Sequence, residues 1–379
     1  MNPDFTALRE RFPTLVERAY FATHGFGPLL RETLRDLDDY RRTLPLRNRV
    51  VATWYERVVE IRGLLARLVG AREGDIALGP NATACQASFA AALAPTAQCD
   101  TILTTDLDFP SSRYLWHAQG QRGYRVIEVP SRDGVAFPVD ELVAAIDRRT
   151  AIVAVPLVAY ANGALLDVER VIAAAHDAGA IVVLDAYQAA GIVPIDVRAL
   201  DVDALVSGTN KWLSSAGMGL AFLYVRRSLA NRLAPAFPGW FAHEDPLAFA
   251  DFFVPAHGAR RFEQGAPAVE AIYGARAGIQ FALEVGVEAI RARSFELTDH
   301  LIAGVDRLGI PLATPRAHDE RAGVVCLDLA DAAAIAETLG AQGIDVDTRP
   351  GTGLRVSCHP CNTLEDVDLL LAGLTAARP

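Results

Sequence analysis

Short apolar runs alternate with amphipathic stretches along most of the chain. In chain order the apolar runs predict strands at residues 75–78, 101–104, 125–129, 151–156, 180–184, 203–207 and 220–224. The stretches between and before them predict helices at residues 58–70, from 83 onward, at 111–119, 139–146 and 168–178. Runs that are apolar throughout suit strands covered on both faces. Strands that alternate with helices therefore indicate an α/β sandwich around a mainly parallel sheet.

The two ends of the chain depart from this alternation. Residues 1–50 are Arg-rich and irregular, with helical stretches and a glycine turn at residues 24–28. Residues 237–267 are rich in aromatic residues and proline and predict a long loop. Beyond the loop we expect helices at 268–285, 332–339 and 364–374, with strands at 323–329 and 353–357. These divisions predict an N-terminal segment (1–50), a large α/β domain (51–250), and a crossover loop with a small α+β domain (251–379).

Composition narrows the classes of protein that fit. The chain has 379 residues and a formal net charge of −10, which argues against a general nucleic-acid binder. It contains no apolar run long enough to cross a membrane, and its N-terminus lacks the apolar core of a signal peptide. The five cysteines are mostly scattered and do not form a disulfide framework. We therefore expect a cytoplasmic protein with no nucleic-acid or membrane partner.

One lysine, Lys211, stands among 36 basic residues, and all the others are arginines. Arginine is effectively never deprotonated, so a Schiff base through a side-chain amine would have to use Lys211. The lysine follows a predicted strand and has small polar neighbours in the stretch Ser-Gly-Thr-Asn-Lys-Trp-Leu at residues 207–213. Taken alone, it could equally be a solvated loop residue.

An acid stands in the corresponding position after another strand. Asp185 directly follows the apolar run at residues 180–184, and ligands of parallel α/β sheets bind outside the carboxyl ends of the strands. Alone, Asp185 could simply cap a helix. Together with Lys211 it forms the pair that pyridoxal 5'-phosphate (PLP) requires, an amine for the Schiff base and a carboxylate that keeps the pyridine nitrogen protonated.

With these residues in place, the chain resembles the class V aminotransferase family of fold-type I PLP enzymes, and within it the kynureninase-like branch. The resemblance covers nearly the whole chain and rests on the order and spacing of short motifs at residues 81–83, 108–112, 185–188, 210–213, 239–241, 261–267, 355–357 and 362–366. It implies the PLP-dependent transferase fold of type I, with a mainly parallel central sheet, helices on both faces and a small C-terminal α+β domain. It also implies a homodimer with shared active sites.

The resemblance assigns roles to particular residues. Lys211 would form the Schiff base and move protons, and Asp185 would pair with the ring nitrogen. Further cofactor contacts are implied for Ala82 and Thr83 (phosphate), Phe109 (ring face), Gln188 (ring oxygen), Thr209 and Asn210 (phosphate), and Trp240 and Gly265 (often across the dimer interface). Arg355 would bind the substrate α-carboxylate. The N-terminal segment would reach the active site through His24.

Several of these residues have structural alternatives. Phe109 and Trp240 could be packing residues, and Thr83 could be only a helix cap. Arg355 could pair with a structural acid, and His24 could only order its turn.

We expect a PLP-dependent lyase or hydrolase of the kynureninase-like kind that cleaves an α-amino acid at the β-carbon. The alternatives are an aminotransferase or epimerase in a biosynthetic pathway, a C–S lyase, and a non-catalytic PLP-fold protein. Gln188 stands where kynureninases usually carry histidine, and Gly265 where they carry asparagine. A cysteine desulfurase is not expected, because the loop at residues 345–353 has no cysteine and Phe109 replaces the stacking histidine.

The Cys-His-Pro-Cys stretch at residues 358–361 has the spacing of half a zinc site or of a redox pair. No second ligand pair is apparent elsewhere in the sequence, so we expect no metal. We expect Cys358 and Cys361 to line the substrate pocket or to lie behind it.

Overall fold

A computed structural model describes residues 3–377 and places seven strands in one large sheet, in the order β2-β8-β7-β6-β5-β3-β4. The strands are β2 (Ile76–Gly79), β3 (Thr101–Thr105), β4 (Arg125–Val129), β5 (Thr150–Pro156), β6 (Ile181–Asp185), β7 (Ala204–Gly208) and β8 (Ala221–Val225). Strand β8 runs antiparallel to both of its neighbours, while the pairs β7–β6, β6–β5, β5–β3 and β3–β4 are parallel. The mainly parallel sheet predicted from the alternating pattern is confirmed.

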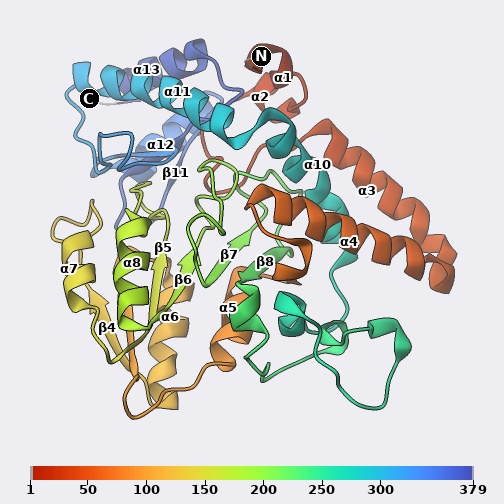
Figure 1. Cartoon of the computed structure of the whole chain (residues 1–379). Coiled ribbons are helices and arrows are strands. Elements are labelled where there is room, and N and C mark those ends of the chain that lie inside the picture. Colours follow the sequence, from red (N-terminus) through yellow and green to blue (C-terminus); the bar gives the residue numbers. More distant parts are fainter. Residues whose placement is uncertain (1–2, 378–379) are drawn as a thin grey trace.

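Successive residues of each strand point to opposite faces of this sheet, and each face has its own hydrophobic core. In β6, for example, Val182 and Leu184 belong to one core and Val183 to the other. The first face is covered by α4 (Val51–Leu68), α7 (Val139–Ala145), α8 (Val168–Ala178) and α10 (Val269–Val285). The second is covered by α5 (Ala82–Ala91) and α6 (Pro110–Ala118), as Figure 1 shows. This double cover explains why the strands are apolar throughout.

A smaller unit follows α10. Its antiparallel sheet has the order β11-β12-β9, formed by β9 (Val324–Leu327), β11 (Asp347–Thr348) and β12 (Leu354–Ser357). The helices α11 (Val287–Arg307), α12 (Ala332–Ala341) and α13 (Leu364–Ala377) share one hydrophobic core with this sheet.

The N-terminal segment packs against this smaller unit. Strand β1 (Ala19–Tyr20) pairs in parallel with β10 (Ile344–Asp345), and Phe21 is buried in the same core. The short helices α1 (Phe5–Arg9) and α2 (Pro13–Glu17) lie beside α13 at the top of Figure 1. The N-terminal segment therefore packs against β10 and the start of α13, for example through the ion pair of Arg9 with Asp366.

One long helix is not predicted by the pattern. Helix α11 has 21 residues, but charged residues interrupt its apolar positions and weaken its periodicity. Helix α3 (Arg31–Thr43) is the longest of the helical stretches expected within residues 1–50, and it packs against α10.

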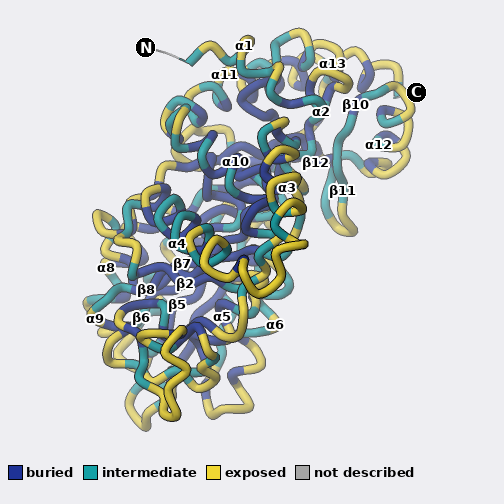
Figure 2. Tube along the Cα trace, turned by 90° about the vertical axis from the view of Figure 1, so that its right-hand side faces the viewer, coloured by how far each residue is buried: buried dark blue, intermediate teal, exposed yellow. Residues whose placement is uncertain are grey.

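The remaining helical elements are short. They are α9 (Arg227–Ala230) and the 3₁₀ turns η1 (Leu44–Val50), η2 (Glu73–Asp75), η3 (Gln119–Arg122), η4 (Trp240–Ala242), η5 (Pro246–Ala248) and η6 (Gly258–Phe262). The last three are the regular elements of the predicted loop at 237–267. Figure 2 shows the buried trace running through the strands of the large sheet, with exposed positions on the outer helices and loops. Within residues 3–377, no helix combines the length and apolar character needed to span a bilayer.

Candidate active site

A cavity of about 640 Å³ lies at the carboxyl ends of the parallel strands, and the small unit supplies one of its walls. Most of its lining comes from the loops that follow the strands, together with the N-terminal turn and the loop after β11. The lining residues include His24, Phe26, Ala82, Thr83, Gln86, Asp108, Phe109, Ser112, Val158, Tyr160, Asp185, Tyr187, Gln188, Asn210, Lys211, Met218, Arg349 and Arg355. The topology thus brings together residues that are far apart in the sequence, at the place where α/β sheets bind ligands.

Asp185 is the last residue of β6 and is held in the cavity floor by three donors. Its Oδ2 accepts hydrogen bonds from Ser112 Oγ at 3.0 Å and from Gln86 Nε2 at 3.2 Å. Its Oδ1 accepts one from the Tyr187 backbone N–H at 2.8 Å. Burial nevertheless raises the pKa of Asp185 above its ordinary value, because a charged carboxylate is poorly solvated there. A cationic group that entered the cavity beside Asp185 would stabilise the carboxylate.

Lys211 lies three residues beyond β7, the parallel neighbour of β6. Its Nζ lies 4.7 Å from the centre of the Tyr187 ring and 5.8 Å from that of Phe109. Burial lowers the pKa of Lys211 to about 8, and the positive charge of Arg355 adds to this shift. An amine with this pKa is neutral far more often near neutral pH than an exposed lysine, so it is suited to nucleophilic chemistry.

The glycine turn at residues 24–28 packs directly on the lysine loop. The Gly27 N–H donates to the Asn210 carbonyl at 2.8 Å, and a Cβ on Gly27 would lie 2.1 Å from the Lys211 carbonyl oxygen. Only a glycine fits this close approach.

Replacing Gly27 with alanine should force this turn away from the lysine loop. We expect the free energy of unfolding to fall by about 1–3 kcal/mol, the usual cost of overpacking. Denaturant unfolding of the Gly27→Ala variant measures this. The matched control is Gly63→Ala on α4, where a Cβ meets no atom within 4 Å and alanine should be neutral or stabilising. Equal stability of the two variants would contradict the tight packing.

The start of α5 forms the opposite end of the cavity. Asn81 caps this helix, its Oδ1 accepting from the Ala84 N–H at 2.8 Å, and Ala82 and Thr83 line the cavity in the first turn. The first N–H groups of a helix have no intrahelical acceptor, and together with the helix dipole they favour an anion. Thr83 is exposed and is not the capping residue, so the purely structural alternative for it is not supported.

Arg355 and His24 lie together on the wall formed by the small unit. The Arg355 guanidinium is buried, donates to the Tyr160 carbonyl at 2.9 Å, and pairs with the Asp347 carboxylate. The His24 ring is also buried, with Nδ1 2.7 Å from Ser357 Oγ and Nε2 3.3 Å from Asp347 Oδ2. Arg355 therefore does pair with an acid of the protein, yet it still lines the cavity.

Gln188 and Asn210 line the cavity, but protein partners already engage their amides. Gln188 Nε2 donates to the His24 carbonyl at 3.1 Å, and its Oε1 accepts from Trp212 Nε1 at 3.3 Å. Asn210 Oδ1 accepts from the Tyr187 hydroxyl at 2.6 Å, and its Nδ2 donates to the Gly25 carbonyl at 3.3 Å. Each NH₂ group keeps one hydrogen for a ligand.

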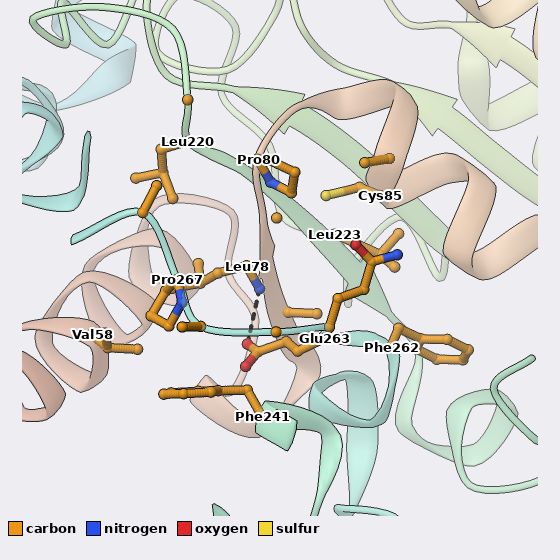
Figure 3. Close-up of a pocket in the computed structure, with 18 residues that line it drawn as sticks. Val58, Leu78, Pro80, Cys85, Leu220, Leu223, Phe241, Phe262, Glu263 and Pro267 are labelled. Carbon is orange, nitrogen blue, oxygen red and sulfur yellow. Dashed lines mark hydrogen bonds between the residues drawn. The ribbon is translucent and has the colours of Figure 1, made fainter. Parts of the chain in front are cut away.

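Three expected cofactor contacts do not lie at this cavity. Thr209 is fully buried, and its hydroxyl bonds Ser215 Oγ at 3.1 Å and the Leu220 carbonyl at 3.2 Å. Trp240 lies in the loop at 237–267, where its indole N–H donates to the Pro246 carbonyl. Gly265 lines a different, smaller cavity of about 220 Å³ (Figure 3). None of these three residues lines the cavity formed within one chain.

Neither cysteine of the Cys-His-Pro-Cys stretch lines the cavity, which leaves the other expected position, behind its wall. Cys358 and Cys361 are buried free thiols in two separate hydrophobic clusters, and burial raises the pKa of each to about 12. They are packing residues in the small unit. Within residues 3–377, no group of three or more His, Cys, Asp or Glu side chains is arranged to hold a metal ion.

Several site residues were not singled out from the sequence as members of the site. Gln86 and Ser112, on α5 and α6, hold Asp185, and Tyr187 packs beside Lys211. Asp347 pairs with Arg355. Ser112 and Tyr187 lie within the motifs at residues 108–112 and 185–188, and their place in these motifs is the sequence signal that could have assigned them to the site. For Gln86 the signal is spatial, because Asp185 lies in a distant part of the chain. Asp347 is close to Arg355 in the sequence, but the register of β11 and β12 is what brings the two together.

Comparisons with known proteins agree with this geometry. The family model described as Aminotransferase class-V matches residues 46–370. The uncharacterized aminotransferase YcbU of Bacillus subtilis (strain 168) is 33% identical over 283 residues, 75% of this chain and 74% of that protein. Kynureninase of Bacillus thuringiensis subsp. konkukian (strain 97-27) is 28% identical over 327 residues, 83% of this chain and 76% of that enzyme.

Among solved structures, a C-DES variant with glycine covalently linked to its PLP cofactor has a TM-score of 0.89 at 22% identity. The match covers 98% of this chain and 99% of that one. This likeness concerns the fold, and it confirms the PLP-dependent fold of type I that was expected from the sequence.

Proposed function

This chain belongs to the class V aminotransferase family of PLP-dependent enzymes, and from that membership we propose that it binds PLP through Lys211 and cleaves an α-amino acid at its β-carbon. The observation that carries the proposal is that Lys211 and Asp185, after neighbouring parallel strands, line the same cavity. The similarity to kynureninase over 83% of the chain supports cleavage at the β-carbon.

The residues of the cavity fit PLP. The first turn of α5 offers N–H groups for a phosphate, Asp185 offers a buried carboxylate for the ring nitrogen, and Lys211 offers the amine. Gln86 Oε1 and Arg355 Nε are buried on lining residues and have no hydrogen-bond partner within residues 3–377. Buried polar atoms of this kind are rare in proteins and indicate a site that receives a polar ligand.

When bound, PLP supplies an electron sink for negative charge at the substrate α-carbon. Lys211 would hold the cofactor and, once the substrate amine displaces it, would move a proton to or from the α-carbon with Nζ. A pKa of about 8 suits both directions of this transfer near neutral pH. Asp185 would hold the proton on the ring nitrogen, with Ser112 and Gln86 keeping its carboxylate in place.

The opposite wall would orient the substrate. Arg355 lines the cavity with N–H groups that no protein acceptor occupies and would bind the α-carboxylate, and His24 lies beside it. The rest of the wall is largely apolar and would contact the substrate side chain. Its members include Phe26, Phe109, Val158, Tyr160 and Met218. In this proposal Phe109 would also lie against the cofactor ring.

We also propose that the enzyme acts as a homodimer in the cytoplasm. Phe237, Phe249 and Phe252 are each more than 60% exposed in the loop that carries Trp240 and leads to Gly265. Exposed apolar groups in one loop are typical of an interface. A partner copy would cover them and would be the chain whose cavity Trp240 and Gly265 approach. The five cysteines are all free thiols, consistent with a reducing compartment.

An aminotransferase is the second candidate. The observation in its favour is the 33% identity to YcbU, which bears that name. Both reactions would begin with the same Lys211 and Asp185 chemistry, and they differ in whether a bond to the β-carbon breaks.

Product analysis of the PLP-loaded enzyme separates the two candidates. With L-kynurenine and related amino acids that carry a γ-carbonyl, we expect water to be consumed. Alanine and a carboxylic acid should form in equal amounts, without any added keto acid. Chromatography with mass spectrometry measures both products. Transfer of the amino group to an added keto acid, with no alanine from the substrate, would contradict β-carbon cleavage and support the aminotransferase.

A further inference from the structure

Asp347 occupies a central place on the substrate wall. In the register of the small sheet, Asp347 of β11 stands directly opposite Arg355 of β12. Side chains of directly opposed residues lie on the same face of an antiparallel pair, so the backbone itself sets this acid beside this arginine. The Asp347 side chain is only 15% exposed.

Three basic groups converge on this carboxylate. Oδ2 accepts from Arg355 Nη2 and lies 3.3 Å from His24 Nε2, and Oδ1 accepts from Arg349 Nη1. Burial and the positive charge of Arg349 lower the pKa of Arg355, while the negative charge of Asp347 raises it. Asp347 therefore allows a buried guanidinium to stay charged and ordered beside a second one.

The contacts of Arg355 leave part of its guanidinium available. Nη1 donates to the Tyr160 carbonyl and Nη2 to Asp347, so the plane of the guanidinium is fixed at two points. The second hydrogen of each Nη is left for a ligand, and Nε has no partner within residues 3–377. A carboxylate ligand would thus meet an arginine whose orientation is already set, which lowers the entropy cost of binding.

His24 lies against the same acid. Its Nε2 is buried 3.3 Å from Asp347 Oδ2 and has no hydrogen-bond partner of good geometry within residues 3–377. On the other side, Ser357 Oγ accepts from the His24 backbone N–H at 3.0 Å and lies 2.7 Å from Nδ1. Burial lowers the pKa of His24 to about 4, so the ring is neutral at pH 7. The ring is thus packed between Ser357 and Asp347.

We propose that Asp347 is a positioning residue that holds Arg355 and His24 in the geometry that receives the substrate. This inference rests on the proposed function, since it takes Arg355 as the group that binds the α-carboxylate. Asp347 itself need not touch the substrate.

The test compares Asp347→Asn with Asp345→Asn in the PLP-loaded enzyme. Asp345 is two residues away on β10, and its ion pair with Arg18 lies outside the cavity, so its loss controls for the removal of an acid from this part of the chain. The dissociation constant for an amino acid is followed by the absorbance of the cofactor, and KM and kcat by product formation. For Asp347→Asn we expect the dissociation constant and KM to rise about tenfold or more and kcat to change less than about threefold.

Further outcomes separate the explanations. Asp347→Glu keeps the charge and should recover most of the affinity, while Asp345→Asn should match the wild type. Unchanged affinity in Asp347→Asn, in an enzyme whose wild type responds to amino acids, would overturn the positioning role alone. Loss of folding in Asp347→Asn, seen by thermal melting, would also overturn it, because Asp347 would then be a structural residue. A wild type that responds to no amino acid would overturn the proposed function and this inference with it.

Discussion

Replacing Lys211 with alanine is expected to lower turnover of any amino acid substrate by at least about 10³-fold. The substitution removes both the amine proposed to hold the cofactor and the base proposed to move the α-proton. No second lysine exists in the chain to take over either role. Steady-state rates of product formation, measured at saturating PLP, test this expectation.

Lys211→Arg is the matched control for charge and size. Arginine keeps a positive charge near Asp185 and the neighbouring rings, yet it cannot supply a neutral amine. The arginine variant should therefore be as inactive as the alanine variant. Activity within about tenfold of the wild type in either variant would contradict a catalytic role for the Lys211 amine.

Replacing Asp185 with asparagine is expected to lower kcat by about 100- to 1,000-fold, the range seen when one well-placed electrostatic group is removed from an active site. The amide has nearly the same size as the carboxylate but cannot hold a proton on the ring nitrogen. Its NH₂ group would also face two donors, Gln86 Nε2 and Ser112 Oγ, instead of accepting from them. Rates and the cofactor spectrum, measured on the same preparation, distinguish weaker catalysis from weaker cofactor binding.

Asp177→Asn is the control for the Asp185 variant. Asp177 is exposed on α8 and does not line the cavity, so the same chemical change there should leave the rate unchanged. If Asp185→Asn kept full kcat with bound cofactor, the proposed pairing with the ring nitrogen would be wrong.

The strands of the large sheet and the pair Lys211 and Asp185 were predictable for one reason. Each strand is apolar throughout, and each of the two residues comes shortly after such a run. The carboxyl ends of parallel neighbours meet at one edge of a sheet, so sequence position alone places both side chains close together. Ala82 and Thr83 came from the family resemblance instead, and the structure places them in the first turn of α5 at the same cavity.

Sequence position alone does not predict the roles of residues that meet only through strand register or tertiary packing. Asp347 opposes Arg355 only through the register of two short strands, and His24 reaches both from the other end of the chain. Thr209 is two residues from Lys211, yet the turn directs its hydroxyl into the protein rather than to the cavity. Helix α11 is not predicted from the sequence because its charged residues interrupt the pattern of the apolar face that the small unit buries.

The most direct test of the account is to locate the bond between cofactor and protein. The purified enzyme is incubated with PLP, reduced with borohydride, digested, and its peptides are sequenced by mass spectrometry. Because Lys211 is the only lysine, the N-terminal amine is the other primary amine that can compete. We expect a pyridoxyl group on the peptide that contains Lys211, and none on that peptide from the Lys211→Ala variant. Unmodified Lys211 in an enzyme that retains PLP and activity would contradict the proposed Schiff base.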